Sequence, residues 1–326
     1  MNSTPKNYRR ALLGAVAASS VLLAACGKKA DDVPAAISAP ATAPVTVAAP
    51  PAGTKSGNAN EQATRKLNAY TGAYNKLIGT FGLIETREDY FEKNIARRTA
   101  ADSISITDGW IEGALDQFKK GRALPASSPD VLDPTADALI GAVDKLVTQL
   151  KELKIYYDSK AYKNDNLARG KAEDAPLRAS FDISMAAMKA FNVALGAEQK
   201  RRDVETLARL KASGDLLAYN TKLALGQGED LLNLFGEGND IKSAAKYVQG
   251  DALAAEIEKI LVTQRELYAA AKTKEPKPDS GPESTASNLL SLVGAYRDMN
   301  QTRKLEEFND LVKEYNRAVE SANGID

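Results

Sequence analysis

Residues 139–157 read LIGAVDKLVTQLKELKIYY, and their large apolar side chains recur in alternating steps of four and three. Because an α-helix makes one turn every 3.6 residues, this spacing places the apolar side chains on one stripe of a helix. The stripe consists of Leu139, Val143, Leu146, Leu150, Leu153 and Tyr157. Such a stripe leaves water only by packing against another helix, so the segment predicts a helical bundle.

Two further segments have the same spacing, one before this stretch and one at the end of the chain. The earlier series is Leu67, Tyr70, Tyr74, Leu77, Phe81 and Ile84, and it resumes at Phe91 and Ile95 after the polar Glu88. The later series is Leu305, Phe308, Val312, Tyr315 and Val319. Three segments that fit one heptad template predict long antiparallel helices.

We call these three apolar series heptad seams. Shorter amphipathic stretches lie between the seams, and breaks that contain Gly, Pro, Asn or Asp separate the stretches at four places. The stretches are 110–118, 177–217, 223–235 and 241–268, and the breaks are 124–134, 164–176, 236–240 and 274–282. We expect the polar residues 198–205 to lie on a solvated part of a long helix. No run of alternating β-branched residues predicts a strand. We therefore predict an all-α domain over residues 60–326, a bundle of six to eight mostly antiparallel long helices.

The composition excludes several functional classes. Lys and Arg total 43 and so do Asp and Glu, so no basic excess favours binding to nucleic acid. The chain has no histidine, which removes the usual general base near neutral pH and the commonest metal ligand. Its single cysteine excludes an intramolecular disulfide and a cysteine-based metal site. We therefore expect no catalytic residues, no metal and no cofactor.

The first residues have the pattern of a secretory signal. Lys6, Arg9 and Arg10 precede an apolar run at 11–23, which is too short for a membrane span of about 20 residues. The run ends in Leu23, Ala24, Ala25 and Cys26, which resembles the lipobox of bacterial lipoproteins. The resemblance implies a signal peptide at 1–25, cleavage before Cys26, a diacylglyceryl thioether on its sulfur, and a fatty acyl chain such as palmitate on the freed amine. A buried cysteine after an ordinary signal peptide is the less favoured interpretation.

Beyond the lipobox, Gly27 stands where inner-membrane lipoproteins carry Asp, so the same resemblance implies the outer membrane, facing the periplasm. Residues 26–59 are rich in Ala and Pro and contain hardly a large apolar side chain. Such a segment cannot bury enough surface to fold, and we predict a disordered tether. It would reach about 30 Å as a flexible coil and about 90 Å as polyproline II.

Aromatic–asparagine pairs recur within the predicted helices, although asparagine is a poor helix former. They are Tyr74-Asn75, Phe191-Asn192, Tyr219-Asn220, Phe308-Asn309 and Tyr315-Asn316. The pairs could form a polar stripe along a groove. We favour the alternative, in which the aromatic rings pack in the core and the amides make hydrogen bonds between helices.

Other candidate sites are better explained as local structure. Asn164-Asp165-Asn166 offers oxygen ligands for calcium, but the EF-hand spacing is missing and a turn is favoured. Residues 236–240, GEGND, lack the third glycine of a phosphate loop, so we predict a helix end and a turn. Adjacent acids such as Glu306-Glu307 and Glu229-Asp230 point about 100° apart on a helix and need not share a site.

Together, several motifs resemble the YiiG-like bacterial lipoproteins, a family of unassigned role. They are the lipobox, KLNAY at 66–70 with YNKL at 74–77, YY at 156–157 with YKNDN at 162–166, and Tyr315-Asn316. That family often carries a histidine after the Tyr-Lys-x-Asp segment, whereas this chain has KAED at 171–174. The resemblance implies a helical envelope lipoprotein and carries over no catalytic or metal-binding residue.

The leading hypothesis is a non-catalytic binding or scaffolding module that a lipid anchor holds at the membrane. Its partner would be a protein, a peptide or cell-wall material, and not nucleic acid. One alternative is an envelope enzyme that uses carboxylates and tyrosines. Another is a structural lipoprotein that self-associates through its heptad seams.

Overall fold

The structure is a computed structural model that describes residues 54–125, 132–236, 240–274 and 279–323. Its α-helices are α2 (Thr54–Ile78), α3 (Leu83–Lys93), α4 (Ile111–Ala123), α5 (Leu132–Asp158), α6 (Ala168–Ser213), α7 (Leu216–Asn233), α8 (Ala244–Lys274), α9 (Gly281–Thr302) and α10 (Leu305–Asn323). Short 3₁₀ turns lie at Ile95–Arg97, Ala161–Lys163 and Asp240–Lys242. Within these ranges all regular structure is helical, which confirms the all-α prediction.

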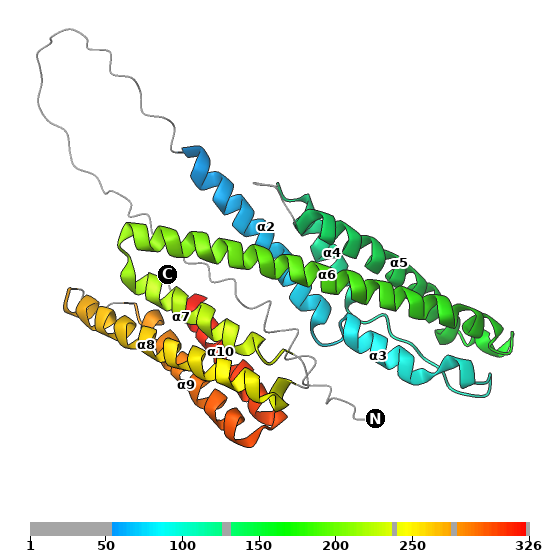
Figure 1. Cartoon of the computed structure of the whole chain (residues 1–326). Helices are drawn as coiled ribbons and strands as arrows, with labels where there is room; N and C mark the ends of the chain where they lie inside the picture. Colours follow the sequence, from blue (N-terminus) through cyan, green and yellow to red (C-terminus); the bar gives the residue numbers. More distant parts are fainter. Residues whose placement is uncertain (1–53, 126–131, 237–239, 275–278, 324–326) are drawn as a thin grey trace, which may run out of the picture.

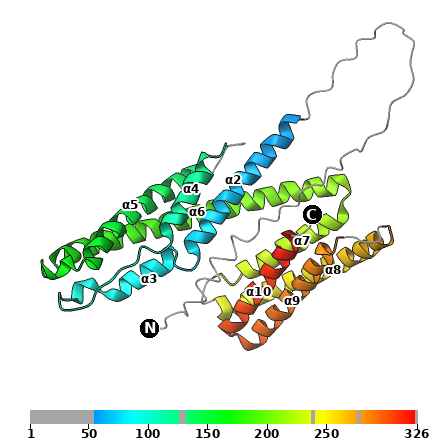
Figure 2. The same ribbon diagram turned by 180° about the vertical axis from the view of Figure 1, so that it is seen from behind.

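The helices form two bundles with separate cores. The N-terminal bundle consists of α2 to α5 and the first part of α6, and the C-terminal bundle consists of α7 to α10 (Figure 1). Helix α6 has 46 residues and carries the chain from one bundle to the other, as both views show (Figure 2). Apart from the shorter α3 and α4, every α-helix in the described ranges has 18 residues or more, which confirms six to eight long helices.

The core of the N-terminal bundle contains the heptad seam of α5, as predicted. All six members of the seam are buried, together with Phe181, Phe191 and Leu195 of α6. Phe191 packs edge-on against Phe118 of α4 and Tyr70 of α2, at ring-centroid distances of 5.1 Å and 5.6 Å. Aromatic side chains therefore connect three helices at the centre of this bundle.

The core of the C-terminal bundle is closed by α10. Phe308, Val312, Tyr315 and Val319 are buried, so the predicted seam at the end of the chain is confirmed. Helix α8 approaches α9 closely at Gly250, where a Cβ atom would lie only 2.5 Å from the hydroxyl oxygen of Tyr296. A larger residue at this position would push the two helices apart.

The predicted seam from Leu67 to Ile95 is not one helix. Helix α2 ends at Ile78 and α3 begins at Leu83, and Phe81 between them has a φ of 57° and is 50% exposed. The glycines on either side end the helix, and Gly82 N–H donates to the Gly79 carbonyl at 3.0 Å. The prediction that Phe81 continues the core stripe is therefore wrong.

Two other predicted boundaries also differ from the structure. Helix α6 begins at Ala168 and contains Pro176, so the predicted break at 164–176 ends earlier than expected. Pro176 is exposed, and water can bond the carbonyl group that loses its partner there. Helix α2 begins at Thr54, within the predicted tether, which has no proline after Pro51.

The polar stretch 198–205 is only partly solvated, contrary to the prediction. Gln199 is 4% exposed, and the Glu198 side chain turns inward because Arg201 and Arg202 both bond to it, at 2.7 Å and 2.8 Å. Arg202 also donates to the hydroxyl of Thr64 at 3.3 Å, so this part of α6 is attached to α2. Opposite charges within the stretch let it approach another helix, which a count of polar residues does not reveal.

The predicted anchor lies outside the described residues. Leu23, Ala24, Ala25 and Cys26, the signal peptide at 1–25, and the tether up to residue 53 all belong to that part of the chain. Among the helices that the structure describes, none combines the length and the apolar character needed to cross a bilayer.

Candidate functional site

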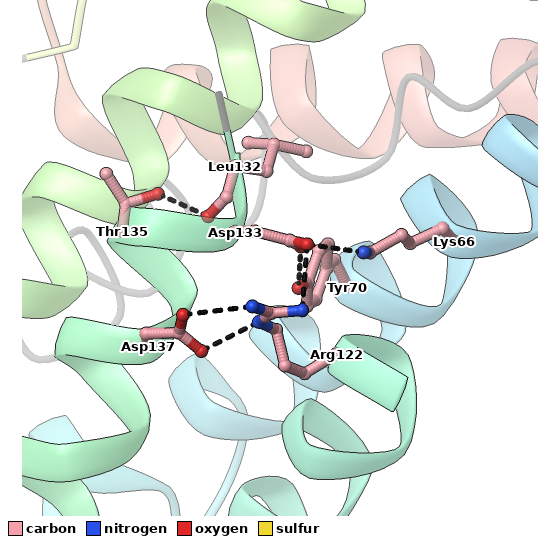
Figure 3. A network of polar contacts seen from close by, with 7 residues as sticks. All are labelled: Lys66, Tyr70, Arg122, Leu132, Asp133, Thr135 and Asp137. Carbon is pink, nitrogen blue, oxygen red and sulfur yellow. Dashed lines mark hydrogen bonds and ion pairs between the residues drawn. The ribbon is translucent and has the colours of Figure 1, made fainter. Parts of the chain in front are cut away.

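The most connected polar cluster of the N-terminal bundle centres on Asp133 (Figure 3). Lys66 Nζ lies 2.7 Å from Asp133 Oδ2, and the Tyr70 hydroxyl donates to Oδ1 at 2.5 Å. Arg122 Nη1 lies 3.0 Å from Oδ2, while its Nε and Nη2 bond to Asp137 at 2.8 Å and 3.2 Å. One buried carboxylate thus connects α2, α4 and α5.

Helix geometry brings these groups together. Lys66 and Tyr70 are four residues apart on α2 and project from the same face. Asp133 lies in the first turn of α5, where the helix dipole favours a negative charge, and Arg122 lies in the last turn of α4, where it favours a positive one. The sequence offered no local signal for this site, because Lys66 and Asp133 are 67 residues apart.

The electrostatics hold Asp133 in its ionised form. Burial raises the pKa of this carboxyl, but hydrogen bonds from Lys66 and Tyr70 and the positive charges of Lys66 and Arg122 outweigh burial and hold the pKa below its usual range. A carboxylate with a lowered pKa and donors on both oxygens is a poor proton acceptor at neutral pH. The contacts of this cluster therefore hold α2, α4 and α5 together.

A second buried carboxylate, Asp174 of α6, has similar surroundings. The Tyr90 hydroxyl donates to it at 2.9 Å and Arg178 Nε at 3.0 Å. Burial, followed by the charge of Asp174, raises the pKa of Tyr90. Arg178 also lies over the ring of Phe91, with its central carbon 4.3 Å from the ring centroid. This cluster attaches α3 to α6.

The predicted turn at Asn164-Asp165-Asn166 is confirmed. Asp165 accepts the Tyr156 hydroxyl at 2.7 Å and the backbone N–H of Arg169 at 3.1 Å. Burial and the bond to Asp165 raise the pKa of Tyr156 to about 12. Asn166 has a φ of 53°, as turns often require. The carboxylate that could have bound calcium instead caps the start of α6.

The C-terminal bundle holds its polar groups by a different chemistry. The Tyr296 hydroxyl lies 2.8 Å from the Tyr247 carbonyl and 2.8 Å from Asp251 Oδ1. The Tyr247 hydroxyl donates to the Ile241 carbonyl at 2.9 Å, and the guanidinium of Arg303 lies 3.3 Å from the centre of the Tyr247 ring. Tyrosine hydroxyls here bond mainly to backbone carbonyls.

The aromatic–asparagine pairs confirm the packing interpretation for four of their rings and contradict the role predicted for their amides. Tyr74, Phe191, Phe308 and Tyr315 are buried, whereas Tyr219 is half-buried. The amide of Asn220 bonds within its own helix, to the Leu216 carbonyl at 2.7 Å. The buried Oδ1 atoms of Asn192 and Asn316 find no partner in the described ranges. These amides therefore do not connect helices.

The other candidate patterns assemble no site. In the ranges that the structure describes, no three His, Cys, Asp or Glu side chains come close enough to share a metal ion. Asp240 pairs with Lys246 at 2.6 Å, and residues 237–239 of the glycine-rich segment lie outside the described residues. Glu306 is exposed whereas Glu307 is half-buried, as expected for two acids that diverge on a helix.

One surface feature was missed at the sequence level, an exposed aromatic pair made of Phe81 and Trp110. The rings meet edge to face at 5.4 Å, and the side chains are 50% and 60% exposed. Trp110 N–H donates to the Phe81 carbonyl at 2.8 Å, and Phe81 N–H donates to Glu85 at 2.7 Å. Gly109 has a φ of 58°. A Cβ atom at this position would lie 2.4 Å from the Phe81 carbonyl oxygen, so only glycine fits. The sequence did contain one indication of this feature, because Gly82 follows Phe81 and Gly109 precedes Trp110.

A family profile described as a protein of unknown function (DUF3829) matches residues 61–296. The chain belongs to the DUF3829 family. The matched region begins in α2 and ends within α9, so it contains both the Asp133 cluster and the aromatic pair, and α10 lies beyond it. Comparison with curated proteins and with solved structures found no significant match.

Proposed function

We propose that this DUF3829 protein is an envelope lipoprotein, anchored through Cys26, whose helical domain binds a protein or peptide partner at the Phe81–Trp110 pair. The observation that carries the proposal is that the two rings contact each other and are both exposed. Tryptophan is enriched among the residues that dominate binding energy at protein interfaces. It is also the only tryptophan of the chain.

The pair is held in place by features that packing alone would not require. Phe81 has a positive φ, which is a strained conformation for an aromatic residue, and backbone strain concentrates at functional sites. Both backbone N–H groups of the pair are bonded, one to Glu85 and one across to the Phe81 carbonyl. Side chains that are already ordered lose little entropy on binding.

The surroundings favour a partner that carries a Lys or Arg side chain. Asp108 lies two residues before Trp110, and Glu85 accepts the backbone N–H of Phe81, whereas Glu112 is already paired with Lys151 at 2.6 Å. A cation over an indole ring gains roughly 0.5–1 kcal/mol at exposed sites. The carboxylates of Asp108 and Glu85 add to that attraction, so a basic and apolar peptide segment fits the site best.

The absence of catalysis is part of the proposal. The buried carboxylates Asp133 and Asp174 are each occupied by a tyrosine and by at least one cation. Carboxylates in this state bind helices together, and an enzyme would need one with a raised pKa. These contacts support a binding role over the alternative of a carboxylate-dependent enzyme.

Site-specific photo-crosslinking in intact cells tests the binding site. Benzoylphenylalanine at position 110 should give a discrete adduct, whereas the same group at Ile155, which is 70% exposed on α5, should not. The adduct should disappear when Phe81→Ser is added, and the captured peptide should contain Lys or Arg. Equal adducts at both positions, or none at position 110, would refute the site.

The anchor is tested separately. Cys26→Ser should release the protein from the membrane fraction, because stable anchoring needs two or more acyl chains. The outer membrane and the YiiG-like subgroup belong to the same proposal, and they rest on Gly27 and on the motifs at 66–77 and 156–166. A Cys26→Ser variant that sediments with membranes as the parent does would contradict the anchor but leave the aromatic site open.

A further inference from the structure

The solvent-facing side of α6 carries a continuous apolar stripe. Its members recur in steps of four and three, and all are exposed: Ala179, Ile183, Ala186, Ala190, Val193 and Ala197. The two largest, Ile183 and Val193, are 56% and 67% exposed. The stripe covers 19 residues, or about 27 Å of helix. We call it the α6 outer stripe.

The outer stripe is a second apolar face of α6, because the first apolar face is already buried in the N-terminal core. Phe181, Met188, Phe191 and Leu195 face the core of the N-terminal bundle. A helix with one buried face normally presents polar residues on the other. Here the six exposed positions of the stripe, spaced four and three residues apart, are all apolar. This face therefore has the composition of a coiled-coil surface that lacks its partner helix.

Charged residues beside the stripe are arranged for a self-complementary contact. Asp182 and Lys189 lie seven residues apart on the same edge. Lys189 has no ion-pair partner among the described residues. Asp182 accepts two hydrogen bonds from Arg87, and both are to Oδ1. Its Oδ2 has no bond to any described residue. Both groups can therefore accept a further partner.

We propose that the α6 outer stripe binds a second copy of this chain, with the two α6 helices antiparallel. A two-fold axis near Ala186 brings Lys189 of each copy against Asp182 of the other, so the same ion pair forms twice. Four of the six stripe residues are alanine, which lets the helix axes approach to about 8 Å. Opposite charges in two-fold register favour a second copy over an unrelated helix or a bilayer.

This contact differs from self-association through the heptad seams considered earlier. Apart from Phe81, Phe91 and Leu305, the members of those seams are buried inside the bundles, as Leu139 and Leu153 are, and cannot meet a second chain. The outer stripe is the seam that remains exposed. The contact also does not depend on the anchor or on the aromatic pair.

Cysteine crosslinking tests the proposal in a full-length chain that carries Cys26→Ser, which removes the only native cysteine. Ala186→Cys lies near the axis and should form a disulfide-linked dimer under mild copper–phenanthroline oxidation. Ala172→Cys is also exposed on α6, but an antiparallel pair separates it from its counterpart by about 40 Å of helix. It should give no dimer. Ala252→Cys, exposed on α8, is the off-site control.

A charge variant adds a quantitative readout. Lys189→Glu places like charges opposite each other and should weaken dimerisation about tenfold in sedimentation velocity, whereas Lys120→Glu, exposed on α4, should leave it unchanged. Equal crosslinking at positions 186 and 172 would indicate parallel helices and overturn the proposal. Crosslinking at position 252 alone, or at none of the three, would also overturn it.

Discussion

The two bundles of this molecule satisfy their interior polar groups in opposite ways. The N-terminal bundle buries Asp133 and Asp174 and neutralises each with a cation from the same or another helix. Among the described residues of the C-terminal bundle, Lys222 is the only buried charged residue, and it pairs with Asp203 of α6 at the junction, at 2.7 Å. Inside that bundle, hydroxyl and amide groups bond mainly to backbone carbonyls.

This difference predicts which bundle should lose more stability when a charged group is removed or neutralised. Removing one member of a buried ion pair leaves the other unpaired, which is far more costly than losing one neutral hydrogen bond. We therefore expect substitution and acid to act first on the N-terminal bundle. Circular dichroism during urea unfolding measures the free energies, and proteolysis of partly unfolded protein identifies the bundle that opens.

The largest effect is expected from Asp133→Ala. Lys66 would remain buried at 4% side-chain exposure without its carboxylate, so the N-terminal bundle should lose about 3–5 kcal/mol. Asp137→Ala is the matched control, since that side chain is 54% exposed and its ion pair contributes about 0–1 kcal/mol. Equal losses from the two variants would show that the Asp133 cluster is not a stabilising centre.

Acid should have a smaller effect in the same place. The folded pKa of Asp133 lies below its unfolded value, so its contribution is present above the unfolded pKa of about 4 and is lost as the pH falls through the folded pKa. Asp102, Asp165 and Glu198 also have lowered pKa values, and all of them precede α7. The N-terminal bundle should therefore become protease-sensitive first below pH 4. Earlier cleavage in α7 to α10 would contradict this order.

Tyr296→Phe should have a modest effect on the C-terminal bundle. The change removes one hydroxyl that contacts a backbone carbonyl and Asp251, and it keeps the ring, so we expect a loss of about 1–2 kcal/mol. Its counterpart Tyr70→Phe removes a bond to the buried Asp133 carboxylate, whereas Asp251 is exposed to water. Tyr70→Phe should therefore cost more, since a bond to a charged group is stronger away from water. The comparison fails if Tyr296→Phe is the more damaging of the two.

Trp110→Ala should have the smallest effect on stability. The side chain is 60% exposed and contacts mainly Phe81, so the free energy of unfolding should change by no more than about 0.5 kcal/mol. Its effect should instead be on partner capture at the aromatic pair. A large loss of stability in urea would mean that the pair is structural.

Regular apolar spacing made the fold class predictable. The stripe from Leu139 to Tyr157 is buried along its whole length, because local periodicity and tertiary packing agree there. The break at Gly79 to Gly82 was not predicted, because Phe81 fits the heptad spacing and its contact with Trp110 comes from 29 residues later in the sequence. Spacing alone cannot distinguish an aromatic residue in the core from one at a loop tip.

The candidate site was less predictable than the fold. Lys66 precedes an apolar seam by one residue, so nothing local indicates that its ammonium group is buried. Its partner lies on another helix, and the pair exists only when α2 and α5 have packed. In the same way, the outer stripe of α6 is recognisable only after the core has shown which face of the helix is already used.

The position of Trp110 also determines how folding of this protein can be followed. A lone indole that is mostly in water emits at long wavelength in the native state as well as in the denatured state. Its fluorescence will change little when either core melts, yet it should shift to the blue as soon as something covers the ring. The intrinsic tryptophan emission of this chain should therefore report the binding of a partner over Trp110, and it should be insensitive to unfolding.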